Sequence, residues 1–320
     1  MKNSQDFWQN LKISAKGGQA IYALAPMAGL TDSAFRQICK GFGADVLYSE
    51  MASVTALVYS PDKTLAMLKF NKMERPYIVQ LFGSNSKHFI KAVKIISKKI
   101  KPDGIDINFG CPVKKVQKQG AGAVLMDDLK LSREIIKSAI VGTVLPISIK
   151  IRSQAGRVDA SQFLNNVSDL DIKAVMIHGR TLKQGFAGDI NWQIIKKARD
   201  FFRGVILANG GVNSWDNAIE LLKKTEADGI GIARGALGRP WIFENVKCQM
   251  SNVKTKEDIF MIAIKHAGLV EKLKGKQGII EMRKHLCAYA SGFLGAGELR
   301  KKLVQAKNLT DIKRMLKQND

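Results

Sequence analysis

The feature that most constrains the fold is a series of eight short apolar segments that alternate with longer segments of helical periodicity. The apolar segments span residues 21–26, 45–50, 77–82, 104–109, 146–151, 174–178, 205–209 and 229–233. The helical segments span residues 33–41, 86–101, 129–141, 160–170, 192–202, 215–224 and 237–248, and residues 61–68 could form a further helix. Near-continuous apolar strands that are each followed by a helix are typical of parallel strands buried on both faces.

This repeated strand–helix unit predicts an α/β fold. Eight units within the first 248 residues fit a (β/α)8 TIM barrel better than an open doubly wound sheet. The open sheet would need a nucleotide-binding glycine fingerprint after its first strand, and Ala25-Pro26-Met27-Ala28-Gly29 is not one. We therefore expect residues 1–248 to form a barrel.

The chain changes character from about Lys254 onward, where no strand-like segment appears. Helical patterns cover residues 257–274 and 279–293, and two shorter ones follow before Asp320. This predicts a separate helical domain, residues 249–320. The alternative is that these helices are extra elements packed under the barrel.

The charge of the chain is strongly positive, with 51 Lys and Arg residues against 28 Asp and Glu residues and a formal net charge of +23. The segment 241–320 is also basic, with 16 Lys and Arg residues against 8 Asp and Glu residues. Such an excess favours a polyanionic partner, with nucleic acid first and an anionic membrane second. A generally lysine-rich proteome would give the same composition, so charge alone leaves the partner open.

Other features argue against several classes of protein. The four cysteines have no paired spacing, which argues against a disulfide framework and against a zinc site. They are Cys39, Cys111, Cys248 and Cys287. Residues 1–16 are polar and lack the apolar core of a signal peptide, and no apolar run approaches the roughly 18 residues that suggest a membrane span. We expect a soluble cytoplasmic protein with no metal, no membrane partner and no obligate protein partner.

Residues able to bind a ligand stand at the predicted strand ends, where barrel enzymes place their catalytic groups. They are Pro26-Met27-Ala28, Glu50, Gln80, Asn108 with Cys111, Lys150, His178 with Arg180, Asn209-Gly210-Gly211 and Ala233-Arg234-Gly235. Polar groups embedded in apolar strands cost stability unless they are paired. A whole set of them is better explained by a ligand than by local hydrogen bonds.

The last two strand ends are glycine-rich turns that lead into helices, at residues 209–211 and 233–235. Barrels commonly bind phosphate with backbone amides of the loops after strands seven and eight. Arg234 would add a charge-assisted contact. The alternative is that these glycines only make tight turns.

Lys150 lies on an apolar segment and is expected to point into the barrel mouth, where it needs a counter-charge. The anionic edge of a reduced flavin would provide one, and Gln80 could hydrogen-bond that edge. A Schiff-base lysine is the alternative. His178 could be a core histidine or a ligand contact, and its neighbour Arg180 favours a phosphate or ring-stacking role.

Cys111 stands in a Gly-Cys-Pro turn that directs its thiol outward from the end of the fourth strand. An ordinary cysteine has a pKa of about 8.5 and is mostly protonated at neutral pH, so it can act as a proton donor. Lys114, Lys115 and Lys118 could lower that pKa or hold a phosphate backbone. The sequence leaves both effects open.

Three blocks of sequence together resemble the bacterial tRNA-dihydrouridine synthases over nearly the whole chain. They are Ala25-Pro26-Met27-Ala28-Gly29-Leu30-Thr31-Asp32, residues 106–125 around Asn108 and Cys111, and a third set formed by His178-Gly179-Arg180-Thr181, Asn209-Gly210 and residues 234–241. The segment Met282-Arg283-Lys284-His285 is similar to the B-type branch of that family.

The resemblance implies a barrel that binds FMN, a helical domain that binds tRNA, and NADPH as reductant. Hydride would pass from reduced FMN to C6 of a uracil, and Cys111 would donate a proton to C5. By matching position, the cofactor contacts would be Pro26, Met27, Ala28, Gln80, Lys150, His178, Asn209, Gly210, Gly211, Ala233 and Arg234. The substrate contacts would be Asn108, Arg180, Lys114 and Lys115.

Two other functions stay open. A small-molecule flavin reductase of the dihydroorotate or dihydropyrimidine dehydrogenase type would share the barrel, although the +23 charge and the basic helical segment speak against it. A non-catalytic RNA-binding protein built on a similar barrel would bind no FMN.

Overall fold

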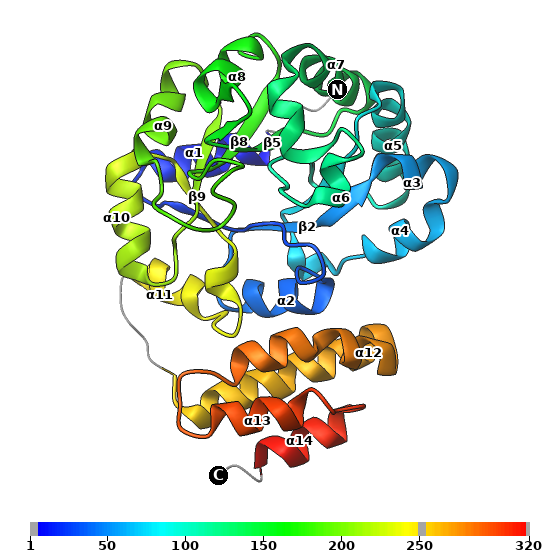
Figure 1. Ribbon diagram of the computed structural model, residues 1–320, viewed down its shortest axis with the longest axis vertical. Coiled ribbons are helices and arrows are strands. Elements are labelled where there is room, and N and C mark those ends of the chain that lie inside the picture. The colour runs from blue at the N-terminus through cyan, green and yellow to red at the C-terminus, as the bar shows by residue number, and fades with distance from the viewer. Residues whose placement is uncertain (1–5, 249–253, 318–320) are drawn as a thin grey trace.

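The computed structural model describes residues 6–248 and 254–317, in which eight parallel strands form a closed barrel (Figure 1). The strands are β1 (Ile21–Leu24), β2 (Val46–Ser53), β3 (Tyr77–Phe82), β4 (Gly104–Phe109), β5 (Ile147–Arg152), β8 (Ile172–His178), β9 (Val205–Asn209) and β10 (Gly229–Ile232). Each pairs with the next barrel strand along the chain, and β1 pairs with β10 to close the barrel. The predicted TIM barrel is confirmed, with strand ends that differ by three residues at most.

Alternate residues of each strand face opposite sides of the barrel wall. Ile107 of β4 and Ile149 of β5 pack outward in the apolar cluster under the surrounding helices. Asn108 and Lys150, which are paired in register on the same strands, instead line a cavity at the barrel's carboxyl end. Because side chains alternate along a strand, an outer face that is wholly apolar is compatible with polar residues inside the barrel.

The segment that the sequence marks only as polar forms the helix α1 (Phe7–Lys16). Asp6 caps this helix, since its side chain accepts a hydrogen bond from the backbone N–H of Trp8. Trp8 is 1% exposed and belongs to the apolar cluster of the barrel interior with Ile21, Val46 and Ile78. These residues lie near the strand starts, so Trp8 closes the end of the barrel opposite the cavity.

The outer helices cover the barrel in the order of the chain. They are α2 (Ser33–Gly41), α3 (Val54–Tyr59), α4 (Pro61–Met67), α5 (Ser86–Lys99), α7 (Leu129–Gly142), α8 (Ala160–Asn166), α9 (Trp192–Lys197), α10 (Trp215–Thr225) and α11 (Ile242–Cys248). The short elements that were not predicted include α3, α6 (Lys114–Gln117) and the hairpin of β6 (Gln154–Ala155) with β7 (Val158–Asp159). Elements this short contain too few apolar repeats to leave a periodic signal.

The C-terminal helices α12 (Lys256–Tyr289), α13 (Ala296–Leu303) and α14 (Leu309–Lys317) lie on the side of the barrel that α2 covers (Figure 1). They share a buried apolar cluster, to which α2 contributes Ala34. Gly275 has a non-helical conformation (φ 62°, ψ −155°) and divides α12 into two stretches, as the sequence predicts. The predicted boundary at residue 249 falls within 249–253, outside the described residues, so the division into two domains stays a prediction.

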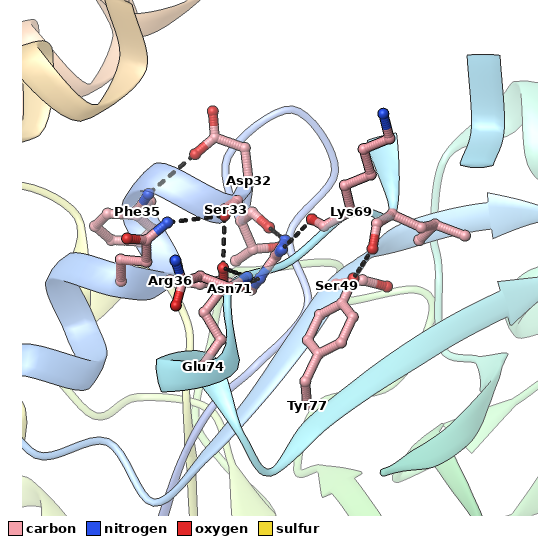
Figure 2. Close-up of polar contacts among 12 residues, drawn as sticks. Asp32, Ser33, Phe35, Arg36, Ser49, Lys69, Asn71, Glu74 and Tyr77 are labelled. Atoms are coloured by element: carbon pink, nitrogen blue, oxygen red, sulfur yellow. Dashed lines mark hydrogen bonds and ion pairs between the residues drawn. The ribbon is translucent and has the colours of Figure 1, made fainter. Parts of the chain in front are cut away.

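A buried ion pair holds α2 and the loop before it. Figure 2 shows Arg36 of α2 reaching Glu74, with 2.6 Å between Arg36 Nε and a carboxylate oxygen. Arg36 also donates to the carbonyl oxygens of Thr31 at 2.7 Å and Lys69 at 3.1 Å. The Thr31 hydroxyl in turn accepts a hydrogen bond from the backbone N–H of Met27 at 3.1 Å. The pair therefore fixes the first strand-end loop of the cavity.

Candidate functional site

A cavity of about 650 Å³ opens at the carboxyl ends of the barrel strands, a size that suits a cofactor or small ligand. Its lining includes Pro26, Met27, Ala28, Gln80, Asn108, Cys111, Lys150, His178, Arg180, Asn209, Gly210, Gly211, Ala233 and Arg234. Of the predicted site residues, Lys114 and Lys115 do not line it and are exposed on α6. The structure thus brings the other predicted residues together, while the role of each stays a prediction.

The turn after β9 is shaped to receive a negative group. Gly210 (φ 114°) and Gly211 (φ 72°) have backbone conformations that favour glycine, and a Cβ on Gly210 would lie 2.8 Å from His178 Cδ2. Both glycines line the cavity, so their backbone is open to a ligand. The guanidinium of Arg234, at the end of β10, lies 4.5 Å from the centre of the Phe186 ring. Backbone N–H groups beside a cation form a typical anion site.

Lys150 faces this turn from β5. Its Nζ donates to Asn209 Oδ1 at 3.1 Å, and Asn209 Nδ2 donates to the carbonyl oxygen of Gly231 at 2.6 Å. Burial, and then the positive charge of Arg152, lower the pKa of Lys150 to about 8. A negatively charged ligand would raise that pKa again, so this position favours an anionic group.

A chain of buried polar groups lies beneath the cavity. Gln80 Nε2 donates to Asp106 Oδ2 at 2.8 Å, and Gln80 Oε1 accepts from Asn108 Nδ2 at 2.9 Å. Asn108 Oδ1 accepts from the backbone N–H groups of Gly110 at 3.0 Å and Cys111 at 2.9 Å. Burial raises the pKa of Asp106 to about 6. The chain connects the barrel interior to the loop that contains the thiol.

Residues 110–122, hereafter the thiol loop, are held by further contacts. Ala123 N donates to the carbonyl oxygen of Cys111 at 3.1 Å, and Arg152 Nε donates to the carbonyl oxygen of Gly110 at 2.8 Å. Gly122 (φ 72°) packs so closely that a Cβ there would lie 2.9 Å from the Cys111 carbonyl oxygen. The loop is therefore tightly fitted around Cys111.

The protonation state of Cys111 follows from its surroundings. Burial raises the pKa of the thiol above its ordinary value, although the backbone of Val113 and the charges of Arg152 and Lys150 act in the opposite direction. The thiol is consequently protonated at neutral pH. A protonated thiol can donate a proton and is a poor nucleophile.

Two side chains with planar rings, His178 and Phe186, line the cavity. Burial lowers the pKa of His178 to about 2, so its imidazole is neutral. Phe186 is 55% exposed, and its ring centre lies 4.5 Å from the guanidinium of Arg234 and 5.8 Å from that of Arg152. Neutral and aromatic rings of this kind suit contact with a planar ligand.

Three further residues at the site, Arg152, Phe186 and Asp106, were not predicted from the sequence. Arg152 is 1% exposed and donates to the carbonyl oxygens of Thr181 at 3.0 Å and Gly185 at 2.8 Å. The alternation of side chains along a strand that predicts an inward Lys150 also predicts an inward Arg152, so this residue could have been found from the sequence. Phe186 belongs to a loop without periodicity, which offers no signal of this kind.

Among the described residues, no group of three or more His, Cys, Asp or Glu side chains is arranged to hold a metal ion. In the same ranges, no helix is both long and apolar enough to cross a membrane.

A closed parallel barrel with polar residues converging at its carboxyl end is the architecture of the TIM-barrel enzymes, and we assign the chain to that class.

Comparisons with known proteins narrow this class. The model of the dihydrouridine synthase family matches residues 23–319, and the chain belongs to that family of flavin-dependent oxidoreductases. The expected resemblance is thereby confirmed. The B-type assignment stays a prediction.

Similar sequences agree with this family assignment, and solved structures agree with the fold. A probable tRNA-dihydrouridine synthase of Aquifex aeolicus (strain VF5) is 32% identical over 304 residues, which cover 94% of this chain and 95% of the relative. One of Helicobacter pylori (strain 26695) is 34% identical, with 91% of this chain and 88% of the relative covered. Two solved structures share the fold alone. A histamine dehydrogenase from Rhizobium sp. 4-9 has a TM-score of 0.55 at 13% identity, covering 78% of this chain and 48% of its own. An old yellow enzyme homologue from Zymomonas mobilis has a TM-score of 0.51 at 12% identity, covering 75% and 92%.

Proposed function

We propose that the chain reduces uridines in tRNA to 5,6-dihydrouridine, with FMN as its cofactor and NADPH as the reductant. The observation that supports this most is that one cavity holds a protonated thiol, Cys111, together with Lys150 and the glycine turn at Gly210. The similar proteins of Aquifex and Helicobacter are named for activity on tRNA. The net charge of +23 agrees with a polyanionic substrate.

The residues of the cavity fit the parts of FMN. The N–H groups of Gly210 and Gly211, with Arg234, suit the phosphate. Lys150 and Gln80 suit the pyrimidine edge of the ring, which is anionic in the reduced state. The other proposed cofactor contacts are Pro26, Met27, Ala28, His178, Asn209 and Ala233. Bound and reduced, FMN supplies the hydride for C6 of the uracil.

The protein's own residues orient the base and supply the proton. Because burial keeps the Cys111 thiol protonated, it holds its proton until C5 of the uracil accepts it. Asn108 and Arg180 line the same cavity and would contact the uridine. The target uridine has to leave the tRNA stack to reach this depth, as enzymes that act on a base generally require.

The surface around the cavity supports binding of an RNA backbone. Lys114 and Lys115 are exposed on α6, within the thiol loop, where they can contact phosphates. The basic C-terminal segment 249–320 would serve as a second tRNA contact. We also propose that the enzyme acts in the cytoplasm, where tRNA is found.

The test compares Cys111→Ala with Cys248→Ala, a control at an exposed cysteine. Each variant is reduced with NADPH and then mixed without oxygen with unmodified tRNA, and flavin reoxidation is followed. Cys111→Ala should retain FMN and its reduction by NADPH but slow reoxidation by tRNA about 100-fold or more, since general acids contribute about that much. Cys248→Ala should match the wild type. Full activity of Cys111→Ala would remove Cys111 from the mechanism.

The same assay separates the alternative functions. Reoxidation by free uracil or orotate at the rate seen with tRNA would favour a small-molecule reductase. A purified protein that is colourless and takes up no FMN would favour a non-catalytic RNA-binding protein.

A further inference from the structure

Asp106 is a buried carboxylate that none of the proposed roles uses. It is 0% exposed and lies on β4 two residues before Asn108, inside the barrel beneath the cavity. Its Oδ2 accepts from Gln80 Nε2 at 2.8 Å, and its Oδ1 accepts from the Ser148 hydroxyl at 2.7 Å. Burying a carboxylate is unfavourable unless its oxygens are satisfied, and here two neutral donors satisfy them.

The ionised carboxylate gives the neighbouring amides a direction. An ionised carboxylate can only accept hydrogen bonds, so Gln80 must turn its NH2 group toward Asp106. Its carbonyl oxygen is then free to accept from Asn108 Nδ2 at 2.9 Å. This leaves Asn108 Oδ1 to accept from two backbone N–H groups of the thiol loop. The two halves of an amide have nearly the same shape, so hydrogen bonding and not packing sets this direction.

We propose that Asp106 is a positioning residue that sets the direction of the Gln80 and Asn108 amides and thereby anchors the thiol loop. If both amides reversed, the NH2 group of Asn108 would face the N–H groups of Gly110 and Cys111. Donors would then oppose donors, and the loop would lose both anchors. The proposal rests on the proposed function for its effect on catalysis, whereas the anchoring itself does not.

The charge of Asp106 makes this anchoring sensitive to pH. Burial raises the pKa of Asp106 to about 6, although its hydrogen bonds from Gln80 and Ser148 and the charge of Lys150 act in the opposite direction. The groups that face it are Gln80 from β3, Tyr48 from β2, and Ser148 and Lys150 from β5. Below that pH the carboxyl is protonated and can donate to the Gln80 carbonyl, so it no longer favours one direction of the Gln80 amide. Anchoring should therefore weaken as the pH falls through about 6.

Two variants test the proposal in the FMN-loaded full-length protein. Asp106→Asn keeps the shape but can donate as well as accept, so it removes the directing charge. Ser148→Ala removes one donor to the carboxylate and leaves its charge, so it should only move the pH at which anchoring fails upward. Ser148 is not one of the residues that line the cavity.

The first readout is the alkylation rate of Cys111 at pH 8, measured by peptide mass spectrometry with the exposed Cys248 as internal reference. Asp106→Asn should speed Cys111 alkylation about fivefold or more relative to Cys248, and Ser148→Ala should not change it. The second readout is flavin reoxidation by tRNA between pH 5 and pH 8. The wild type should slow on the acid side, Ser148→Ala should slow at a higher pH with the same maximum, and Asp106→Asn should be slow throughout.

Unchanged Cys111 alkylation in a folded Asp106→Asn protein would overturn the proposal. If that variant does not fold, the proposal would instead be overturned by reoxidation that slows at the same acidic pH in Ser148→Ala as in the wild type. Failure of every form to reduce tRNA would refute the proposed function, while the alkylation assay would still decide the role of Asp106.

Discussion

Gly122→Ala is the substitution whose effect on the site follows most directly from the structure. A Cβ at this position would lie 2.9 Å from the carbonyl oxygen of Cys111 and 3.1 Å from its Cβ. Carbon atoms in ordinary contact are about 3.5–4.0 Å apart, so Cys111 has to move by roughly half an ångström. The left-handed backbone of Gly122 (φ 72°) adds about 1–2 kcal/mol of strain for any residue with a Cβ.

Gly120→Ala is the matched control. Gly120 has a similar backbone (φ 67°), but its nearest contact to a new Cβ is Ser84 at 3.6 Å, which is ordinary packing. Backbone strain should lower the free energy of unfolding of both variants in urea by about 1–2 kcal/mol, and Gly122→Ala should lose more because its Cβ also overlaps Cys111. They should differ in their effect on Cys111.

The assay is single-turnover reoxidation of the reduced enzyme by unmodified tRNA. A displacement of 1 Å can slow a reaction about 100-fold, so half that displacement predicts roughly a tenfold loss in Gly122→Ala. Gly120→Ala should stay within about twofold of the wild type. Equal reoxidation rates for the two variants, measured where both are folded, would refute the idea that the fit of Gly122 positions Cys111.

Further predictions concern stability. Arg36→Met leaves Glu74 buried without its partner and should lower the free energy of unfolding by about 3–5 kcal/mol in a urea titration. The control Arg75→Met breaks the exposed pair with Asp103 and should lower it by less than about 1 kcal/mol. Burial lowers the pKa of His285 to about 4, so the unfolded chain takes up a proton first and the protein loses stability as the pH falls below 6.5. Between pH 6.5 and pH 5 this loss is about 2 kcal/mol, and it should be absent from the corresponding titration of His285→Gln.

The barrel was predictable because its strands are marked by composition alone. The segment around Lys150 reads Ile147-Ser148-Ile149-Lys150-Ile151, in which isoleucines form the outer face and polar residues the inner one. Because parallel strands of a barrel end on the same face, residues as far apart in sequence as Gln80 and Arg234 could be predicted to line one cavity.

What the sequence could not supply depends on burial and on contacts between distant segments. The sequence left open whether the lysines that follow Cys111 lower its pKa, and in the structure burial raises the pKa of the thiol against the charges of Arg152 and Lys150. The insertion of Trp8 into the barrel likewise depends on residues from several strands, which no local pattern reveals.

The burial of Trp8 also has a kinetic consequence. Because this ring seals one end of the barrel in the described part of the chain, an electron donor and an RNA can approach the reacting ring only from the other end. They must therefore take turns at a single entrance. We expect a ping-pong order, with parallel lines in double-reciprocal plots. A large excess of either substrate should inhibit the reaction with the other.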